Sequence, residues 1–370
     1  MSASEAVTSV TGGGVSNGHA PARASSPFSL RPAALVVGLI VLLVVALLLG
    51  VGIGAVPIAP LDAVAIILRH LGIDIAAPAP AQDDAILWSI RLPRVLLGAL
   101  VGGGLAVSGA TLQGLFRNPL ADPGVIGVAS GASVGAVAAI VLGFSGAFYG
   151  SLQLCAFACG VATALLVYAL ARFEGRTETV TLILTGIAIT AIAGAAIGFM
   201  IARANDQQLR DVVFWSLGSL GGSTWPLVVA TAPFVLVGSA VSLRFARDLD
   251  LLALGEREAR HLGVDTERTR IVLIAALALA VGASVAAAGV VAFVGLVVPH
   301  VIRLLAGPGH AALLPASFLA GAALLVLADL AARTLVVPSE LPLGVVTSLI
   351  GGPFFLWLIW HTRRARGGWG

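Results

Sequence analysis

The sequence predicts an all-α, polytopic membrane protein with about ten transmembrane helices. Of its 370 residues, 58% are hydrophobic and only 11% are charged, and the mean hydropathy is +1.03. These values lie far outside the range of soluble domains. Because one membrane-spanning helix needs about 20 apolar residues, the chain has room for about ten spans and their connections.

The first span follows a tail of different composition. Residues 1–31 are rich in Ser, Gly, Ala and Pro, which predicts a disordered N-terminal tail. The apolar run 33–55 is too long for the core of a secretory signal, so it predicts a true span. From there, residues 32–370 are expected to form one transmembrane domain.

The second and third spans are separated by a break with a clear local logic. An amphipathic segment 61–71 and a Pro-rich loop up to Asp84 come first, and a span is expected from Arg91-Leu92-Pro93-Arg94 to about residue 116. Asn118 can adopt the left-handed conformation that ends a helix. Asp122 can cap the next helix, and Pro123 suits its first turn. The third span is therefore predicted at 123–142.

Two of the spans carry small residues at intervals of four, a spacing that lets helix backbones approach closely in lipid. In the fifth span this ridge either allows sliding against neighbours or only packs tightly. The polar segment 203–211 and a Gly- and Ser-rich turn at 215–222 follow that span. The ridges are Gly127, Gly131 and Gly135 in the third span, and Gly186, Thr190, Gly194 and Gly198 in the fifth. Spans four to ten are predicted at about 147–171, 179–202, 225–245, 269–287, 289–305, 313–334 and 343–360.

A polar segment from Arg244 to Arg270 interrupts this apolar pattern with twelve charged residues. Within it, residues 251–262 predict a short helix with Asp250 as its N-cap and Gly263 just beyond its C-terminus. Glu256 and Arg260 form an i,i+4 pair. The helix is either a solvated loop element or a surface on which another protein docks. Its expected apolar face consists of Leu251, Leu254, Gly255, Ala259 and Leu262.

The distribution of arginine predicts the orientation in the membrane. Ten spans place both termini on one side, and a cytoplasmic N-terminus puts 15 of the 21 arginines inside, as the positive-inside rule requires. Both termini and the segment 244–270 are then cytoplasmic. Six arginines remain on the outside, either snorkelling at span ends or serving a function. They are Arg69, Arg91, Arg94, Arg203, Arg210 and Arg333.

The chain contains no lysine, since all 21 basic residues are arginine. The phosphate-binding loop of P-loop ATPases requires a lysine, so any ATP must be bound by a separate chain. The arginines lie at span ends and not in a basic patch interleaved with aromatic residues, which argues against a nucleic-acid partner.

Three local features offer alternatives. Cys155 and Cys159 lie one turn apart in a span without His or carboxylate neighbours, so small core residues are expected and no metal site. Ser133 lies in a Gly-x-Ser-x-Gly match and would need His300 as its base in a membrane serine protease, but the match falls in mid-span. Asp329, deep in a span, suggests an ion-coupled secondary transporter or an ion pair with Arg333 one turn later.

Five motifs in order resemble the FecCD family, the permease subunits of type II ABC importers for iron-siderophores, haem and cobalamin. The resemblance covers essentially everything after residue 33. The motifs are Arg91-Leu92-Pro93-Arg94; Gly109 to Gln113 with Asn118-Pro119-Leu120-Ala121-Asp122-Pro123 and Gly127; Gly255, Ala259 and Leu262-Gly263-Val264; Phe293-Val294-Gly295-Leu296 with Pro299-His300 and Arg303; and Glu340-Leu341-Pro342-Leu343-Gly344 with Thr347 and Gly351-Gly352-Pro353-Phe354-Phe355.

The resemblance implies the ten-span type II ABC importer permease fold in the bacterial inner membrane and a transport subunit that is not an enzyme. A second permease subunit, expected to be identical, would form a dimer with two cytoplasmic ATPase subunits and a periplasmic binding protein. ATP and Mg would be bound by the ATPase, and no cofactor or metal by this chain. A cytoplasmic coupling loop 246–267 would contact the ATPase through Leu251, Gly255, Glu256, Ala259, Arg260, Leu262 and Gly263. Arg91, Arg94 and Arg333 would meet acidic residues of the binding protein, and Gly186, Thr190, Gly194 and Gly198 would line the translocation path.

The substrate is the finest point of the resemblance. Leu209-Arg210-Asp211 and the run from Phe214 to Leu220 look more like haem permeases than siderophore permeases. Arg203 and Arg210 near the outer mouth would attract haem propionates, or only balance nearby aspartates. Haem is therefore expected ahead of a ferric siderophore, with cobalamin third, while uptake driven by ions through Asp329 stays a remote alternative.

Overall fold

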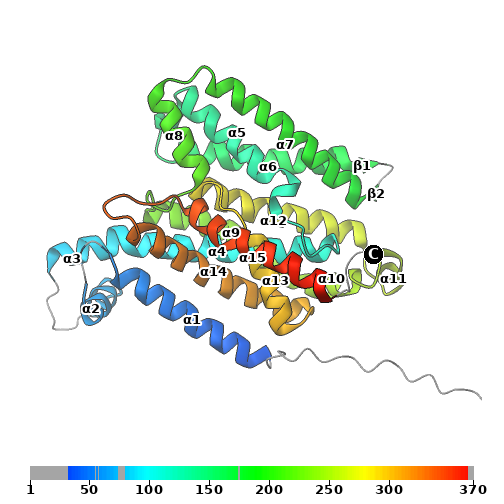
Figure 1. The fold of residues 1–370 in the computed structure, drawn as a ribbon, viewed down its shortest axis with the longest axis horizontal. Helices are drawn as coiled ribbons and strands as arrows, with labels where there is room; N and C mark the ends of the chain where they lie inside the picture. Colours follow the sequence, from blue (N-terminus) through cyan, green and yellow to red (C-terminus); the bar gives the residue numbers. More distant parts are fainter. Residues whose placement is uncertain (1–31, 55, 57, 74–79, 174–175, 366–370) are drawn as a thin grey trace, which may run out of the picture.

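The computed structural model is a bundle of helices that run roughly along one direction (Figure 1). It describes residues 32–54, 56, 58–73, 80–173 and 176–365, so the predicted tail 1–31 lies outside the described residues. Within that part of the chain, seven helices are long and apolar enough to cross a membrane, and three shorter apolar helices accompany them. Each of the ten predicted spans is found as a helix, and seven of these helices have the length and composition of a membrane span. The ten helices are α1 (Pro32–Gly52), α4 (Leu92–Leu115), α5 (Val128–Val141), α6 (Ser151–Ala171), α7 (Thr179–Ile201), α9 (Trp225–Arg244), α12 (Thr266–Ala288), α13 (Val294–Ala306), α14 (His310–Thr334) and α15 (Leu343–Ala365).

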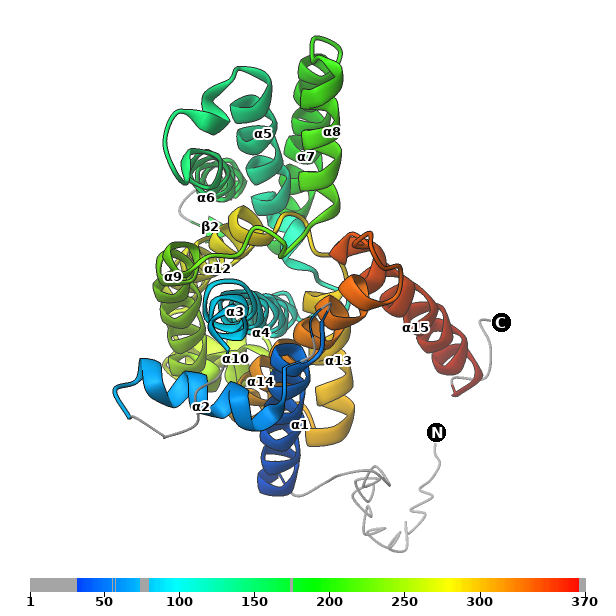
Figure 2. The ribbon, with the colours of Figure 1, turned by 90° about the vertical axis from the view of Figure 1, so that its left-hand side faces the viewer.

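Helix α4 forms the centre of the bundle, with α9, α12, α13 and α14 around it (Figure 2). In the span from Ala81 to Leu115, 83% of an apolar stretch of 18 residues is buried inside the protein. Glycines make this packing possible, because a Cβ added to Gly102 would overlap the carbonyl oxygen of Gly321, and one added to Gly109 would overlap that of Gly295. Helices α5 to α8 form a second group beside this core (Figure 1).

Close packing of the third span is confirmed by its contact with α6. A Cβ on Gly131 would overlap Thr163, and one on Gly135 would overlap the carbonyl oxygen of Cys155. Cys155 and Cys159 are free cysteines at this contact, but both are only half-buried, so they lie at the edge of the packed region and not in the core.

The second span begins ten residues earlier than predicted. Helix α3 (Ala81–Ile86) and the π-helical turn η1 (Leu87–Arg91) lead directly into α4, where a loop was expected. Asp83 and Asp84 lie in the first turn of α3, where carboxylates favour a helix. The π turn lies just before Pro93, which has no backbone N–H to donate to the carbonyl one turn earlier. Pro93 was expected to open the span, but it lies inside a continuous helix.

The predicted break after α4 is confirmed, with two changes. Arg117 and not Asn118 has the left-handed conformation, with φ 50°, while the Asn118 Oδ1 accepts a hydrogen bond from the Leu120 N–H at 2.9 Å. Asp122 caps the next element as expected, since its Oδ1 accepts from the Gly124 N–H at 2.8 Å. That element is the short 3-10 helix η2 (Pro123–Ile126), so α5 starts only at Val128.

Two small helices flank the spans at one end of the molecule. The amphipathic helix α2 (Pro60–His70) is confirmed. The segment expected as a polar stretch and turn is instead helix α8 (Asp206–Leu217), which begins with a capping box between Asn205 and Gln208. After α8, Gly218 with φ 75° packs against the carbonyl oxygens of Ala288 and Val290, a close approach that a larger residue would block.

At the other end of the molecule, the prediction of a single helix at 251–262 is wrong. The structure has α10 (Ala246–Leu252) and α11 (Glu256–His261), separated at Gly255. Gly255 has φ 127°, which a residue with a side chain rarely adopts, and this turn was not recognised from the sequence. Asp250 therefore lies inside α10 and is not an N-cap, whereas Gly263, with φ 90°, follows α11 as predicted. The two-residue strands β1 (Arg172–Phe173) and β2 (Arg176–Thr177) lie at the same end (Figure 1).

Candidate functional site

The polar elements gather at the two ends of the bundle. Helices α10 and α11 and the β1–β2 hairpin lie at one end, and α2, α3 and α8 lie at the other (Figure 1). Helix α1 begins and α15 ends on the side of α10 and α11, so the described ends of the chain share that side, as an even number of spans requires. The candidate site therefore has three parts: two polar ends and the helix faces between them.

At the α10–α11 end, two large apolar side chains point into solvent. Leu254 is 63% exposed and Leu262 is 58% exposed, whereas Ala259 is fully buried against the bundle. The predicted apolar face is thus divided, because the turn at Gly255 rotates the two short helices relative to each other. The predicted pair of Glu256 and Arg260 is present at 3.5 Å.

Arg270 holds α11 on the bundle, a role that was missed in the sequence. Its side chain is 5% exposed. It donates to the Thr177 carbonyl and to Glu256, and its Nη1 lies 3.5 Å from Glu267. Arg270 thereby joins β2, α11 and α12. The only signal in the sequence was an arginine within the first turn of an apolar helix, which equally indicates a simple span-end anchor.

Helix α7, the predicted wall of the translocation path, is the least buried of the long spans, with 17% of its apolar window inside the protein. Gly186 packs against the carbonyl oxygen of Val125. The Thr190 hydroxyl lies 3.2 Å from that of Ser130. Gly194 and Gly198, however, have no neighbouring atom within 4 Å of an added Cβ. The predicted ridge is therefore packed over its first half and open over its second half.

Arg203 and Arg210 lie beyond the open half of α7, at the end that carries α8. The Arg203 guanidinium carbon lies 5.9 Å from the centre of the Phe199 ring, and the Arg210 Nη2 donates to the Gln207 Oε1 at 2.9 Å. In the described chain no ion pair joins either arginine to an aspartate. A cavity of about 870 Å³ opens beside α8, and its wall includes Tyr149, Gln153, Asp211, Phe214 and Trp215.

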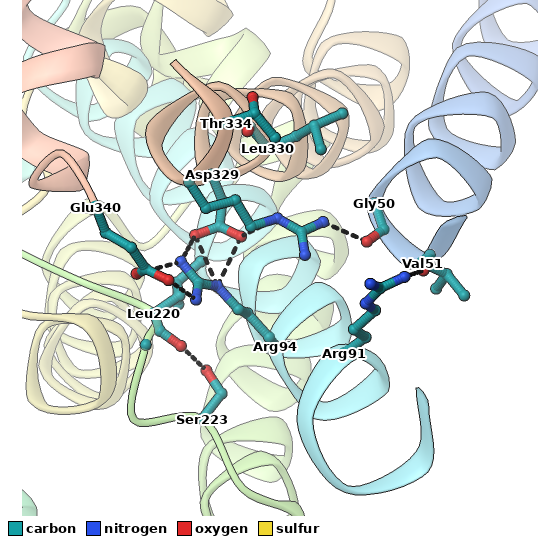
Figure 3. A network of polar contacts seen from close by, with 12 residues as sticks. Gly50, Val51, Arg91, Arg94, Leu220, Ser223, Asp329, Leu330, Thr334 and Glu340 are labelled. Atoms are coloured by element: carbon teal, nitrogen blue, oxygen red, sulfur yellow. Dashed lines mark hydrogen bonds and ion pairs between the residues drawn. The ribbon is translucent and has the colours of Figure 1, made fainter. Parts of the chain in front are cut away.

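Arg94 is the centre of a polar network at the same end (Figure 3). Its Nε donates to the Asp329 Oδ2 and its Nη2 to the Asp329 Oδ1, both at 2.9 Å. Its Nη1 donates to the Glu340 Oε1 at 2.9 Å. The side chains of Arg94 and Asp329 are 9% and 4% exposed, whereas that of Glu340 is 47% exposed. These hydrogen bonds from Arg94 hold the pKa of the Glu340 carboxyl below its usual range.

The other two arginines predicted for docking bind the end of α1. Arg91 donates from Nη1 to the carbonyl oxygens of Val51 at 2.7 Å and Gly52 at 3.0 Å, and Arg333 donates to the carbonyl of Gly50. They thus satisfy carbonyl groups that the end of a helix leaves free. Arg333 lies 3.9 Å from Asp329, so the pair expected between them is secondary to the contact with Arg94. The three arginines lie together where the end of α1, the start of α4 and the end of α14 meet. Their role in docking stays a prediction.

The structure does not support the two remaining alternatives, a serine protease site and a metal site. The Ser133 hydroxyl donates to the Ala129 carbonyl of its own helix at 2.9 Å, and neither ring nitrogen of His300 has a hydrogen-bond partner in the part of the chain that the structure describes. A nucleophile–base contact is therefore not formed. A group of three metal-ligating side chains is likewise not found among the described residues.

Known proteins resemble this chain over most of its length. Residues 42–361 match the model of the FecCD transport family. The cobalamin import system permease protein BtuC of Halobacterium salinarum is 47% identical over 293 residues, which cover 78% of each chain. The hemin transport system permease protein HmuU of Yersinia pestis is 45% identical over 303 residues, covering 78% of this chain and 88% of HmuU. A solved structure described as a metal-chelate type ABC transporter in an inward-facing conformation is 32% identical, with a TM-score of 0.78, and the match covers 90% of this chain and 100% of that one.

Proposed function

Since the chain belongs to the FecCD transport family, we propose that it is the permease subunit of an ATP-driven importer that carries a metal chelate, haem in the first place, into the cytoplasm. The observation that carries this proposal is the family match across residues 42–361, which runs from within α1 to near the end of α15. The fold is that of a type II ABC importer permease, and the chain is a multi-pass membrane protein.

The engine of transport is proposed to be a separate ATPase that binds ATP and Mg. The absence of lysine from the sequence supports this division of labour, because this chain cannot form a P-loop. The exposed Leu254 and Leu262 supply an apolar contact on the α10–α11 end, where such a partner would dock. In this arrangement α10 and α11 face the cytoplasm of a bacterium and the binding protein docks at the opposite end, in the periplasm.

The path is proposed to lie between two copies of the chain that face each other across α7. The low burial of α7 supports this, because an apolar helix with Gly194 and Gly198 uncovered offers a surface for a second subunit. Nucleotide binding below would then move the bundle groups apart on one side and together on the other. This chain makes and breaks no covalent bond; it opens and closes a path.

Haem is preferred as the cargo because of charge. Haem carries two propionate groups, and Arg203 and Arg210 lie at the outer end of α7 without a carboxylate partner among the described residues. Cobalamin is the second candidate, favoured by the 47% identity to a cobalamin permease. This similarity places cobalamin ahead of a ferric siderophore, which the sequence alone had ranked second.

Uptake of haem and uptake of cobalamin, measured separately, test the proposal. Proteoliposomes that contain the permease, its ATPase and its binding protein are expected to take up haem when ATP is inside. Arg203→Gln combined with Arg210→Gln is expected to lower haem uptake roughly fivefold, the loss of about 1 kcal/mol of attraction at an exposed site. Arg69→Gln on α2 is the matched control, since Arg69 pairs with Asp84 at 3.0 Å. Haem uptake that is unchanged in the double variant, or uptake of cobalamin alone, contradicts the assignment of haem.

A further inference from the structure

Helix α14 is bound to both polar ends of the molecule. It runs from His310 to Thr334, so its 25 residues extend over about 37 Å, enough to cross the hydrocarbon part of a membrane. Its first residue contacts α10, and its last turns contact α1, the start of α4 and, through the Ala332 carbonyl, the loop before α15. An element with this placement can carry a displacement from one end of the molecule to the other.

Helices α4 and α14 run antiparallel and touch at three levels with a nearly constant register. Arg94 meets Asp329 near one end, the backbones of Gly102 and Gly321 touch at the middle, and Gly114 lies against His310 at the other end. As the residue number rises along α4, it falls by nearly the same amount along α14. Each glycine faces backbone or ring atoms that leave no room for a Cβ, so the two helices are in close contact at all three levels.

At the end that faces α10, the carboxylate of Asp250 bonds to α14, beside the apolar packing of α10 on α4 and α14. Asp250 Oδ1 accepts from the backbone N–H of His310 at 2.9 Å and lies 2.6 Å from the His310 Nδ1. Because an ionised carboxylate only accepts hydrogen bonds, Nδ1 carries the proton. The His310 ring is 5% exposed. Its Nε2 lies against Gly114 of α4 and has no hydrogen-bond partner in the described chain. The His310 ring, which belongs to α14, therefore contacts both α10 and α4.

At the far end, the same pair holds a group that solvent can reach. Asp329 and Arg94 are almost fully buried, and Arg94 also binds the half-exposed Glu340 in the loop that leads to α15. A displacement of the pair would therefore move Arg94 and change its contact with Glu340. Figure 3 shows this end of the pair, with Arg94 between the two carboxylates.

We propose that Asp250 and His310 are positioning residues that transfer the displacement of α10 to the α4–α14 pair, which carries it as one rigid body to the Arg94–Glu340 contact at the opposite mouth. The inference rests on the proposed function, because it assumes that a partner moves α10. It adds the route by which this movement reaches the other side of the membrane.

The test uses the assembled transporter with its ATPase and binding protein. Cysteines at Asp206 of α8 and Val336 after α14, with Cys155 and Cys159 replaced by alanine, carry spin labels for a distance measurement across the mouth. The parent is expected to change this distance when ATP is bound. Asp250→Ala is expected to abolish the change and to lower uptake per ATP hydrolysed roughly tenfold, a typical size for the loss of a coupling contact. The ATPase should still co-purify and hydrolyse ATP.

Two further variants make the outcome decisive. Asp248→Ala removes a carboxylate from the same helix. Asp248 accepts from Thr269 of α12 at 3.2 Å and forms no hydrogen bond or ion pair with α14 among the described residues, so this variant should keep the distance change. Asp250→Asn keeps an acceptor for the His310 N–H and is expected to fold and to lose coupling in part, which covers the case that Asp250→Ala does not fold. A full distance change in both Asp250 variants, or its equal loss in Asp248→Ala, overturns the inference. If the parent itself takes up no substrate with ATP, the proposed function fails instead.

Discussion

Arg94 illustrates what a single residue does in this structure and why its partners were hard to predict. The sequence pointed to Arg94 and to Asp329 for separate reasons, and it offered Arg333 as the partner of Asp329 because the two lie one turn apart. The partner to which Arg94 donates most of its hydrogen bonds, Asp329, is 235 positions away. Local spacing shows only contacts within one helix, so pairs between helices need the fold. Glu340 was visible only as part of a motif.

Removal of Asp329 is expected to destabilise the protein strongly. Asp329→Ala leaves the Arg94 guanidinium buried with only Glu340 as a charged partner, and breaking a buried pair in this way costs about 3–5 kcal/mol. Thermal unfolding in detergent measures the effect as a lowered midpoint. Glu340→Ala is the matched control and should cost much less, because that side chain is 47% exposed and Asp329 remains. Equal midpoints for both variants would show that Asp329 is not the main support of Arg94.

The contact of Glu340 with Arg94 is expected to make stability depend on pH. The pKa of Glu340 is held below its ordinary value in the folded state, so the carboxylate contributes stability above the pKa of the unfolded chain. That contribution is lost as the pH falls through the lowered pKa. The difference in unfolding midpoint between the parent and Glu340→Gln should therefore shrink toward zero on acidification. A difference that is constant from neutral to acidic pH contradicts this assignment.

Among the elements, α10 and α11 differ most from their prediction. One helix was expected because residues 251–262 have a suitable cap, charge pair and apolar face. The structure ends α10 at Leu252 and starts α11 at Glu256, because Gly255 adopts a φ of 127°. A glycine inside a helical pattern does not reveal whether it stays helical or forms a turn, since both are open to it. Prediction was more successful for the break after α4, where Asp122 and Pro123 carry specific helix-start signals.

The two exposed leucines of this element are expected to bind the ATPase. Leu254→Ser and Leu262→Ser remove apolar contact area, and burial of one leucine contributes about 1.5–3 kcal/mol, so each change should weaken association at least about tenfold. Binding of the purified ATPase to the permease in detergent measures this. Leu61→Ser on α2 is the control, since Leu61 is 83% exposed at the opposite end. Unchanged ATPase affinity in both α11-end variants would remove this surface from the interface.

For the whole molecule, the number and order of the spans could be predicted because a lipid bilayer demands long apolar helices with internally bonded backbones. Even the short span 289–305 was expected, and it corresponds to α13. The arrangement of the spans could not be predicted in the same way. Nothing in the hydropathy of α4 distinguishes a central helix from a peripheral one such as α7, although 83% of one and 17% of the other lies inside the protein. The burial of α4 comes from its contacts with α9, α12, α13 and α14, which lie far from it in the chain.

The energy source of transport tests the central claim most directly. Proteoliposomes with the permease, its ATPase and its binding protein are supplied either with ATP and Mg inside or with a proton gradient and no nucleotide, and accumulation of haem is measured over time. Accumulation with ATP alone, abolished when the ATPase subunit is left out, is the predicted result. Accumulation driven by the proton gradient without nucleotide, and lost in Asp329→Asn, would contradict an ATP-driven permease and identify an ion-coupled secondary transporter.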